Sequence, residues 1–279
     1  MATFESQVHA LTNIGATLSG TTTPTDVQLD QFLKDGVIDV TDKCIATMPR
    51  EIQNFQRVST IKDANNSFRL NGAKIVSVLR EANADGAADA SSAWRPCSLI
   101  PPSLESRVID PDSLDFASIY HPVYMIADDG YINVYPAPDD TNDGFKVYYV
   151  NNVPVDKSGA ALLHSHSDIG YFADHKVYLV VIYAAIKCIE TKMSAMHASI
   201  PAYSNQTTVS DDWAFIKRAI ETEEDLELGG GRAQTLGAEM QQFAAEYQWY
   251  QGRAQTLKQE YMAAFNINAP KPQPEGSKR

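Results

Sequence analysis

The sequence predicts an α+β fold in which a bundle of long helices carries an inserted antiparallel β region and ends in an extended C-terminal tail. Three observations lead to this prediction. Apolar residues recur at helical spacing towards both ends, the middle is rich in β-branched and aromatic residues, and the last residues are proline-rich. We therefore expect an N-terminal helical segment (1–54), a β-rich insertion (55–160), C-terminal helices that complete the bundle (161–266) and a tail (267–279).

The first long helix is predicted between Thr25 and Pro49. Thr25 and Gln28 have the spacing of a capping box, and Pro49 ends the pattern. The apolar residues between these ends follow one another at steps of one, three or four, which predicts one buried stripe: Leu29, Phe32, Leu33, Val37, Val40, Cys44 and Met48.

The middle of the chain predicts strands. The segments "PVYMIA" and "YINVYP" flank Asp128-Asp129-Gly130, which is a strong hairpin signal. Further strands are expected at "FQRVSTI", "AKIVSVLR" and "GFKVYYV". Residues 97–115 are expected to be loop, because prolines and charges interrupt their apolar residues.

Helices are expected again after residue 160. Residues 167–199 predict a long helix with Ser167 or Asp168 as its cap. A second helix is expected over residues 210–228, capped by Ser210. Asp211 and Asp212 in its first turn suit the helix dipole.

The last predicted helix contains a repeat. Gly-Arg-Ala-Gln-Thr-Leu occurs at residues 231–236 and again at residues 252–257, an offset of 252 − 231 = 21 residues, or three heptads. An unbroken heptad pattern runs through both copies, with gentle supercoiling expected. Its members form a seam: Ala233, Leu236, Met240, Phe243, Tyr247, Tyr250, Ala254, Leu257, Tyr261 and Ala264.

Two interpretations of this seam stay open. The seam packs inside the chain's own helical bundle, or neighbouring subunits meet on it. The candidate packing or interface residues are Leu236, Met240, Phe243, Tyr247, Tyr250, Leu257 and Tyr261. The triplet Gly229-Gly230-Gly231 is expected to break the helix, because three glycines cost about 3 kcal/mol relative to alanine in a helix interior.

Charge and cysteine content narrow the function classes. The net charge of −12 argues against a protein that coats nucleic acid. Three widely spaced cysteines predict neither a disulfide framework nor a CxxC metal site, and they favour a reducing compartment. The longest apolar run, "VYLVVIYAAI", is too short for a membrane span, and the N-terminus does not resemble a signal peptide.

One stretch resembles a metal site. "HSHSDI" nearly matches the HxHxDH signature of the metallo-β-lactamase superfamily, with His164, His166 and Asp168 in place but Ile169 where the last histidine should be. Two imidazoles and a carboxylate can hold a metal ion. The alternative is a histidine-rich loop before a helix cap. No GxSxG, HExxH or dinucleotide fingerprint occurs, so we expect a protein that is not an enzyme and has no cofactor, with a metal-dependent hydrolase as the alternative from another class.

The whole chain resembles the head-to-tail adaptors of tailed bacteriophages, which form a ring beneath the portal. "LDQFLKDGVIDVTDKCIATMP" is similar to the opening helix of these proteins, and "PVYMIADDGYINVYPAPDDTNDGFKVYYVNNVP" is similar to the β segment of many phage neck proteins. "VYLVVIYAAIKCIETKM" and "EYQWYQGRAQTLKQEY" are similar to the closing helices. Together these stretches cover about a third of the chain.

The resemblance implies a structural protein of the virion neck that is assembled in the host cytoplasm. Its implied partners are other copies of itself in a ring of twelve, the portal, and tail or nozzle proteins. DNA would pass through the ring without specific binding, which an acidic protein favours because like charges repel. No membrane contact is expected. Another neck or tail component, such as a tail-terminator-like ring protein, is the alternative within the same biology.

The tail "NAPKPQPEGSKR" predicts an extended, basic arm. Its alternating prolines exclude helix and favour a polyproline-like conformation. The resemblance implies that such a segment docks on the portal or on a neighbouring subunit. The candidate docking residues are Pro270, Lys271, Pro272, Pro274, Lys278 and Arg279. A solubilising tail is the alternative.

Overall fold

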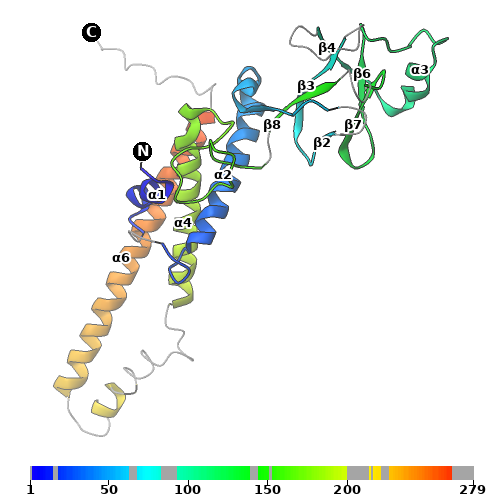
Figure 1. Cartoon of the computed structure of the whole chain (residues 1–279). Helices are drawn as coiled ribbons and strands as arrows, with labels where there is room; N and C mark the ends of the chain where they lie inside the picture. Colours follow the sequence, from blue (N-terminus) through cyan, green and yellow to red (C-terminus); the bar gives the residue numbers. More distant parts are fainter. Residues whose placement is uncertain are drawn as a thin grey trace, which may run out of the picture. The chain divides into compact units, whose positions relative to one another are not determined.

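The chain divides into two compact units in the computed structural model (Figure 1). The structure describes residues 2–14, 18–62, 68–82, 93–138, 144–150, 153–199, 214, 216–220 and 226–265. Unit 1 consists of Met1–Val40, Leu162–Ser167 and Val177–Arg279. Unit 2 consists of Thr41–Ala161 and Asp168–Lys176.

The α+β class fits the structure, but the predicted bundle of long helices with an inserted antiparallel region is wrong. The β residues form two four-stranded sheets within unit 2, and one sheet contains a parallel pair. These sheets enclose a hydrophobic core of their own, so they are a second packed unit and not an insertion that a helix bundle supports.

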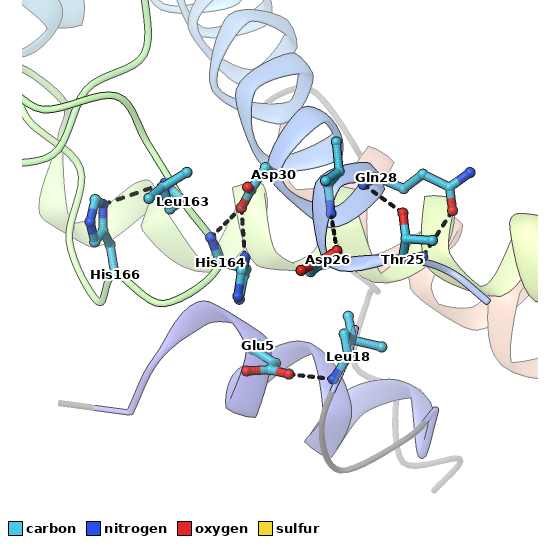
Figure 2. Close-up of polar contacts among 10 residues, drawn as sticks. Glu5, Leu18, Thr25, Asp26, Gln28, Asp30, Leu163, His164 and His166 are labelled. Atoms are coloured by element: carbon cyan, nitrogen blue, oxygen red, sulfur yellow. Dashed lines mark hydrogen bonds and ion pairs between the residues drawn. The ribbon is translucent and has the colours of Figure 1, made fainter. Parts of the chain in front are cut away.

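Helix α2 (Asp26–Thr47) begins with the predicted capping box. The Thr25 N–H donates to Oε1 of Gln28 over 2.9 Å, and the Gln28 N–H donates to Oγ1 of Thr25 over 3.2 Å (Figure 2). The predicted stripe is confirmed at Leu29, Leu33, Val37, Val40 and Cys44, all of which are buried. Gly36 lies against α4 of unit 1, because a Cβ there would be 3.0 Å from Cδ1 of Tyr183.

Helix α1 (Phe4–Thr12) and helix α4 (Val177–Ser199) pack against each other in unit 1. Helix α4 begins at Val177, nine or ten residues after the predicted cap at Asp168 or Ser167, and follows the 3₁₀ turn η4 (Asp174–Lys176). The predicted cap is wrong because Asp168 has another partner: its carboxylate accepts a hydrogen bond from the Lys157 N–H over 3.2 Å.

Helix α6 (Leu226–Phe265) includes the glycine triplet, so the predicted break at residues 229–231 is wrong. Gly229 is buried, and a Cβ at this position would lie 2.9 Å from Cγ1 of Ile220. Ile216 and Ala219 are buried as well. The missing side chain therefore lets the helical residues 216–220 approach α6, and this packing offsets the low helix propensity of glycine.

The first sheet of unit 2 has the strand order β1-β8-β3-β4. Its strands are β1 (Gln56–Val58), β3 (Lys74–Glu81), β4 (Trp94–Pro96) and β8 (Phe145–Val150), all paired antiparallel. The strands predicted from "FQRVSTI", "AKIVSVLR" and "GFKVYYV" are confirmed as β1, β3 and β8. The 3₁₀ helix η1 (Pro49–Phe55) leads into β1.

The second sheet has the order β2-β7-β6-β5. Its strands are β2 (Phe68–Arg69), β5 (Ser98–Leu99), β6 (Val123–Ile126) and β7 (Tyr131–Tyr135). The predicted hairpin is confirmed: β6 and β7 pair antiparallel across the 3₁₀ turn η3 (Asp128–Gly130), where Gly130 has a φ of 77°.

Residues 97–115 are not simply loop, contrary to the prediction. They contain β5, the 3₁₀ turn η2 (Pro102–Leu104) and helix α3 (Glu105–Ile109). Proline is compatible with the first turn of a helix, so Pro102 begins η2 where it was expected to prevent regular structure.

The two sheets share one core. Val78, Phe145 and Val147 come from the first sheet, and Tyr124, Ile132 and Val134 from the second, with Leu70 beside them. Inward-facing residues alternate with outward-facing ones along β7, as expected for a strand with one buried face. Within the described part of the chain, no helix is long and apolar enough to cross a membrane.

Candidate interaction surface on helix α6

The C-terminal part of α6, residues 250–265, is the packed half of the seam. Tyr250, Ala254, Leu257, Tyr261 and Phe265 are all buried, and Leu257 is 0% exposed. Tyr250, Ala254, Leu257 and Tyr261 follow the predicted heptad spacing, whereas Phe265 is buried in place of the predicted Ala264, which is only half-buried. The burial predicted for Tyr250 and Leu257 is therefore confirmed, and the cover comes from helices of the same unit.

Polar contacts fasten the packed half to three helices. The Arg253 Nε–H donates to the Leu11 carbonyl at 2.9 Å, which ties α6 to α1. The Tyr261 hydroxyl donates to the Asp39 carboxylate on α2. Lys258 Nζ lies 2.8 Å from Oε1 of Glu190 on α4.

Glu190 also contacts Lys187 one turn earlier, with 3.1 Å between Oε2 and Nζ. Partial burial on its own raises the pKa of the Glu190 carboxyl, but the hydrogen bonds and charges of Lys258 and Lys187 outweigh it, so the pKa lies below its ordinary value. The hydrogen bond between Glu190 and Lys187 also raises the pKa of the Lys187 ammonium group. Both charges are therefore favoured by the fold at neutral pH.

Aromatic contacts complete this interface. The rings of Tyr183 and Tyr261 have centroids 5.9 Å apart, and Tyr261 meets Phe265 edge-on at 5.2 Å. Burial raises the pKa of the Tyr183 phenol. Sequence reasoning identified the apolar seam but missed its polar anchors, because Asp39, Glu190 and Arg253 carry no recognisable signal without knowledge of which helices are neighbours.

The N-terminal part of the seam, residues 233–249, is its open half. Met240 is 47% exposed, and Phe243 and Tyr247 are only half-buried, so the burial predicted for these two aromatic residues is incomplete. Trp249 beside the seam is 50% exposed. In Figure 1 this orange stretch of α6 extends past α1 and past the end of α4. The side chain of Leu236 lies outside the described residues.

The two copies of the repeat have the same local structure. Thr235 Oγ1 donates to the Gly231 carbonyl over 3.0 Å, and Thr256 Oγ1 donates to the Gly252 carbonyl over 3.1 Å. Ala254, in the second copy, is buried, whereas its counterpart in the first copy, Ala233, is exposed. Among the described residues, the chain thus presents one apolar seam and covers only its C-terminal half.

The two histidines of the predicted metal motif hold their loop, around residues 163–166, against helices α1 and α2. Nδ1 of His164 lies 2.9 Å from Oδ1 of Asp30, which also accepts the His164 N–H (Figure 2). Nδ1 of His166 accepts the Leu163 N–H over 3.4 Å, and its carbonyl accepts the Phe4 N–H over 2.8 Å. Both histidines belong to unit 1.

Asp168, the third candidate ligand, belongs to unit 2 and binds the Lys157 N–H there. The three candidate ligands therefore bind separate partners. Among the described residues, no three His, Cys, Asp or Glu side chains are placed to hold a metal ion.

The three cysteines are free thiols. Burial raises the pKa of Cys97 and of Cys188 to about 12, and it also raises the pKa of Cys44. Thiols with such pKa values stay protonated at neutral pH and are poor nucleophiles.

The predicted docking residues of the tail, from Pro270 to Arg279, lie outside the described residues. Searches with models of known protein families and among curated proteins found no match to this chain. The open half of the seam and the sequence resemblance are therefore the observations that bear on function.

Proposed function

We propose that this protein is a structural head-to-tail adaptor of a tailed phage, which forms a ring between the portal and the tail through which DNA passes. The open half of the seam is the observation that carries this proposal. Met240, Phe243 and Tyr247 continue the spacing of a packed helical interface but have no full cover within the described chain. A symmetric ring gives each copy the same neighbour, and that neighbour covers the exposed helix face.

Two further features support the proposal. The chain resembles adaptors in its opening helix, β segment and closing helices. Its net charge of −12 suits a channel wall that repels the phosphates of passing DNA. In this proposal the ring has the twelve copies that the resemblance implies, the basic tail docks on the portal or a neighbour, and the protein resides in the virion neck after assembly in the host cytoplasm.

The test is the mass of the purified full chain, measured alone and with the portal of the same phage. We expect a ring that forms alone or on the portal. Met240→Asp should abolish ring formation while the melting temperature of the isolated chain changes little, because Met240 is 47% exposed. Val27→Asp is the matched control, since Val27 is an exposed apolar residue on α2, elsewhere in the same unit.

Two results would contradict the adaptor. The first is a chain that neither oligomerises nor binds the portal or other neck proteins. The second is assembly that Met240→Asp and Val27→Asp affect equally. Assembly on the tail tube instead of the portal would favour the tail-terminator-like alternative.

A further inference from the structure

A short loop in unit 2 displays apolar side chains to solvent. Helix α3 ends at Ile109, and residues 109–116, with the sequence Ile-Asp-Pro-Asp-Ser-Leu-Asp-Phe, follow its buried residue Val108. Leu114 is as exposed as a leucine in an extended chain, at 106%, and Ile109 and Phe116 are about half exposed. Single exposed apolar residues are common, but three within eight residues concentrate exposed apolar surface in one short loop.

The loop is held in place at its base. The Ala117 N–H donates to the Val108 carbonyl over 3.0 Å, and both residues are buried. Helix α3 is tied to the sheet at its other end, where the Tyr135 hydroxyl donates to the Glu105 carboxylate over 2.5 Å. Residues 109–116 therefore project from a fixed base.

Hydrogen bonds within the loop fix its internal shape. The Ser113 N–H donates to the Asp110 carbonyl over 3.0 Å, and the Phe116 N–H donates to the Ser113 carbonyl over 3.2 Å. The Asp112 and Asp115 N–H groups donate to the side chains of Asp110 and Ser113. Leu114 is thus presented by an ordered turn, which lowers the conformational entropy lost on binding.

Charge narrows the choice of partner. The loop contains Asp110, Asp112 and Asp115 and no basic residue. The nearest base along the chain, Arg107, pairs with Asp115 at 3.6 Å on the surface. An acidic frame around an apolar tip repels nucleic acid and anionic lipid, and it complements a protein surface with Lys and Arg around an apolar pocket.

We propose that the 109–116 loop is a docking knob, which inserts Leu114 into an apolar pocket of a different protein whose rim is basic. The proposal does not depend on the adaptor function, because it stands on the geometry and charge of this loop alone. The carboxylates would speed association and set its orientation, and Leu114, once buried in the partner's pocket, would supply most of the affinity.

The first step of the test uses the full chain with p-benzoylphenylalanine at position 114. A matched chain carries it at position 99, where Leu99 is 60% exposed in the same unit. Both are irradiated in an extract of the cells that naturally produce the protein, and adducts are identified by mass spectrometry. We expect one protein adduct from position 114 that is absent from position 99. The proposal is overturned by no adduct at position 114, by equal adducts at both positions, or by an adduct with lipid, nucleic acid or a second copy of this chain.

The second step measures binding of that protein, purified, to full-length variants. Leu114→Ser should weaken binding by about tenfold or more, because it removes the apolar surface that the pocket would bury. The double variant Asp112→Asn with Asp115→Asn should also weaken it and should reduce its dependence on salt, whereas Leu99→Ser should leave it unchanged. Because Leu114 is fully exposed, Leu114→Ser should keep the wild-type melting temperature. Equal affinity of wild type and Leu114→Ser would overturn the proposal.

Discussion

The packed and open halves of helix α6 carry the same six-residue repeat in different surroundings. In both copies the threonine donates to the glycine carbonyl four residues earlier, at 3.0 Å and 3.1 Å. In the packed half, α6 packs along α4 and also contacts α1 and α2 through side chains, while the open half leaves Met240 nearly half exposed. The comparison teaches that a heptad pattern determines which face of a helix is apolar, but the tertiary fold determines how much of that face is covered.

The largest expected difference between the halves concerns a charge placed on the seam. Leu257→Asp should lower the free energy of unfolding by about 3 kcal/mol or more, because the carboxylate enters a contact that excludes water and offers no partner. Met240→Asp, on the same seam but exposed, should change it by less than about 1 kcal/mol. Thermal and urea unfolding of the isolated chain measure both. Equal melting of Leu257→Asp and wild type would show that the packed half does not stabilise the fold.

Features set by neighbouring residues could be predicted from the sequence. The capping box of Thr25 and Gln28 depends on four consecutive residues, and the hairpin at Asp128-Asp129-Gly130 depends on a glycine that accepts positive φ. The apolar seam of α6 follows from spacing alone.

Features set by distant residues could not be predicted. Gly229 tolerates a helix because Ile220 packs against it, and the propensity of three glycines indicated a break. Asp168 does not cap α4 because the Lys157 N–H binds its carboxylate. The two sheets form a separate unit because side chains far apart in the sequence, such as Val78 and Ile132, pack in one core, and the sequence did not indicate this pairing. For the candidate surface, the sequence indicated the seam but not the boundary at residue 250 between its covered and open parts.

A smaller difference in stability is expected between variants of Gly229 and Gly230, which precede the open half of α6. Gly230→Ala should stabilise α6 by up to about 1 kcal/mol, because alanine has the higher helix propensity and, outside the backbone of α6 itself, no atom of the described residues lies within 4 Å of the added Cβ. Gly229→Ala should gain less or destabilise, because its Cβ would lie 2.9 Å from Cγ1 of Ile220. Far-ultraviolet circular dichroism and thermal melting of the two variants test this. If both variants stabilise equally, the contact between α6 and residues 216–220 does not constrain position 229.

The smallest effect is expected from the ion pair that joins the packed half to α4. The folded-state pKa of Glu190 lies below its ordinary value, so its contribution to stability is present above the unfolded-state pKa of about 4.3 and is lost as the pH falls through the folded-state pKa. More than a third of the side chain is solvent-exposed, so the contribution should be about 0.5 kcal/mol or less at low salt. Lys258→Gln should therefore melt slightly below wild type at neutral pH, and the gap should close as the solution is acidified below the folded-state pKa.

Lys192→Gln, which removes a charge from α4 but leaves Glu190 with both of its lysines, is the matched control and should show no such pH-dependent gap. A gap that stays constant from neutral to acidic pH would mean that Lys258 stabilises the packed half through its aliphatic chain and not through Glu190.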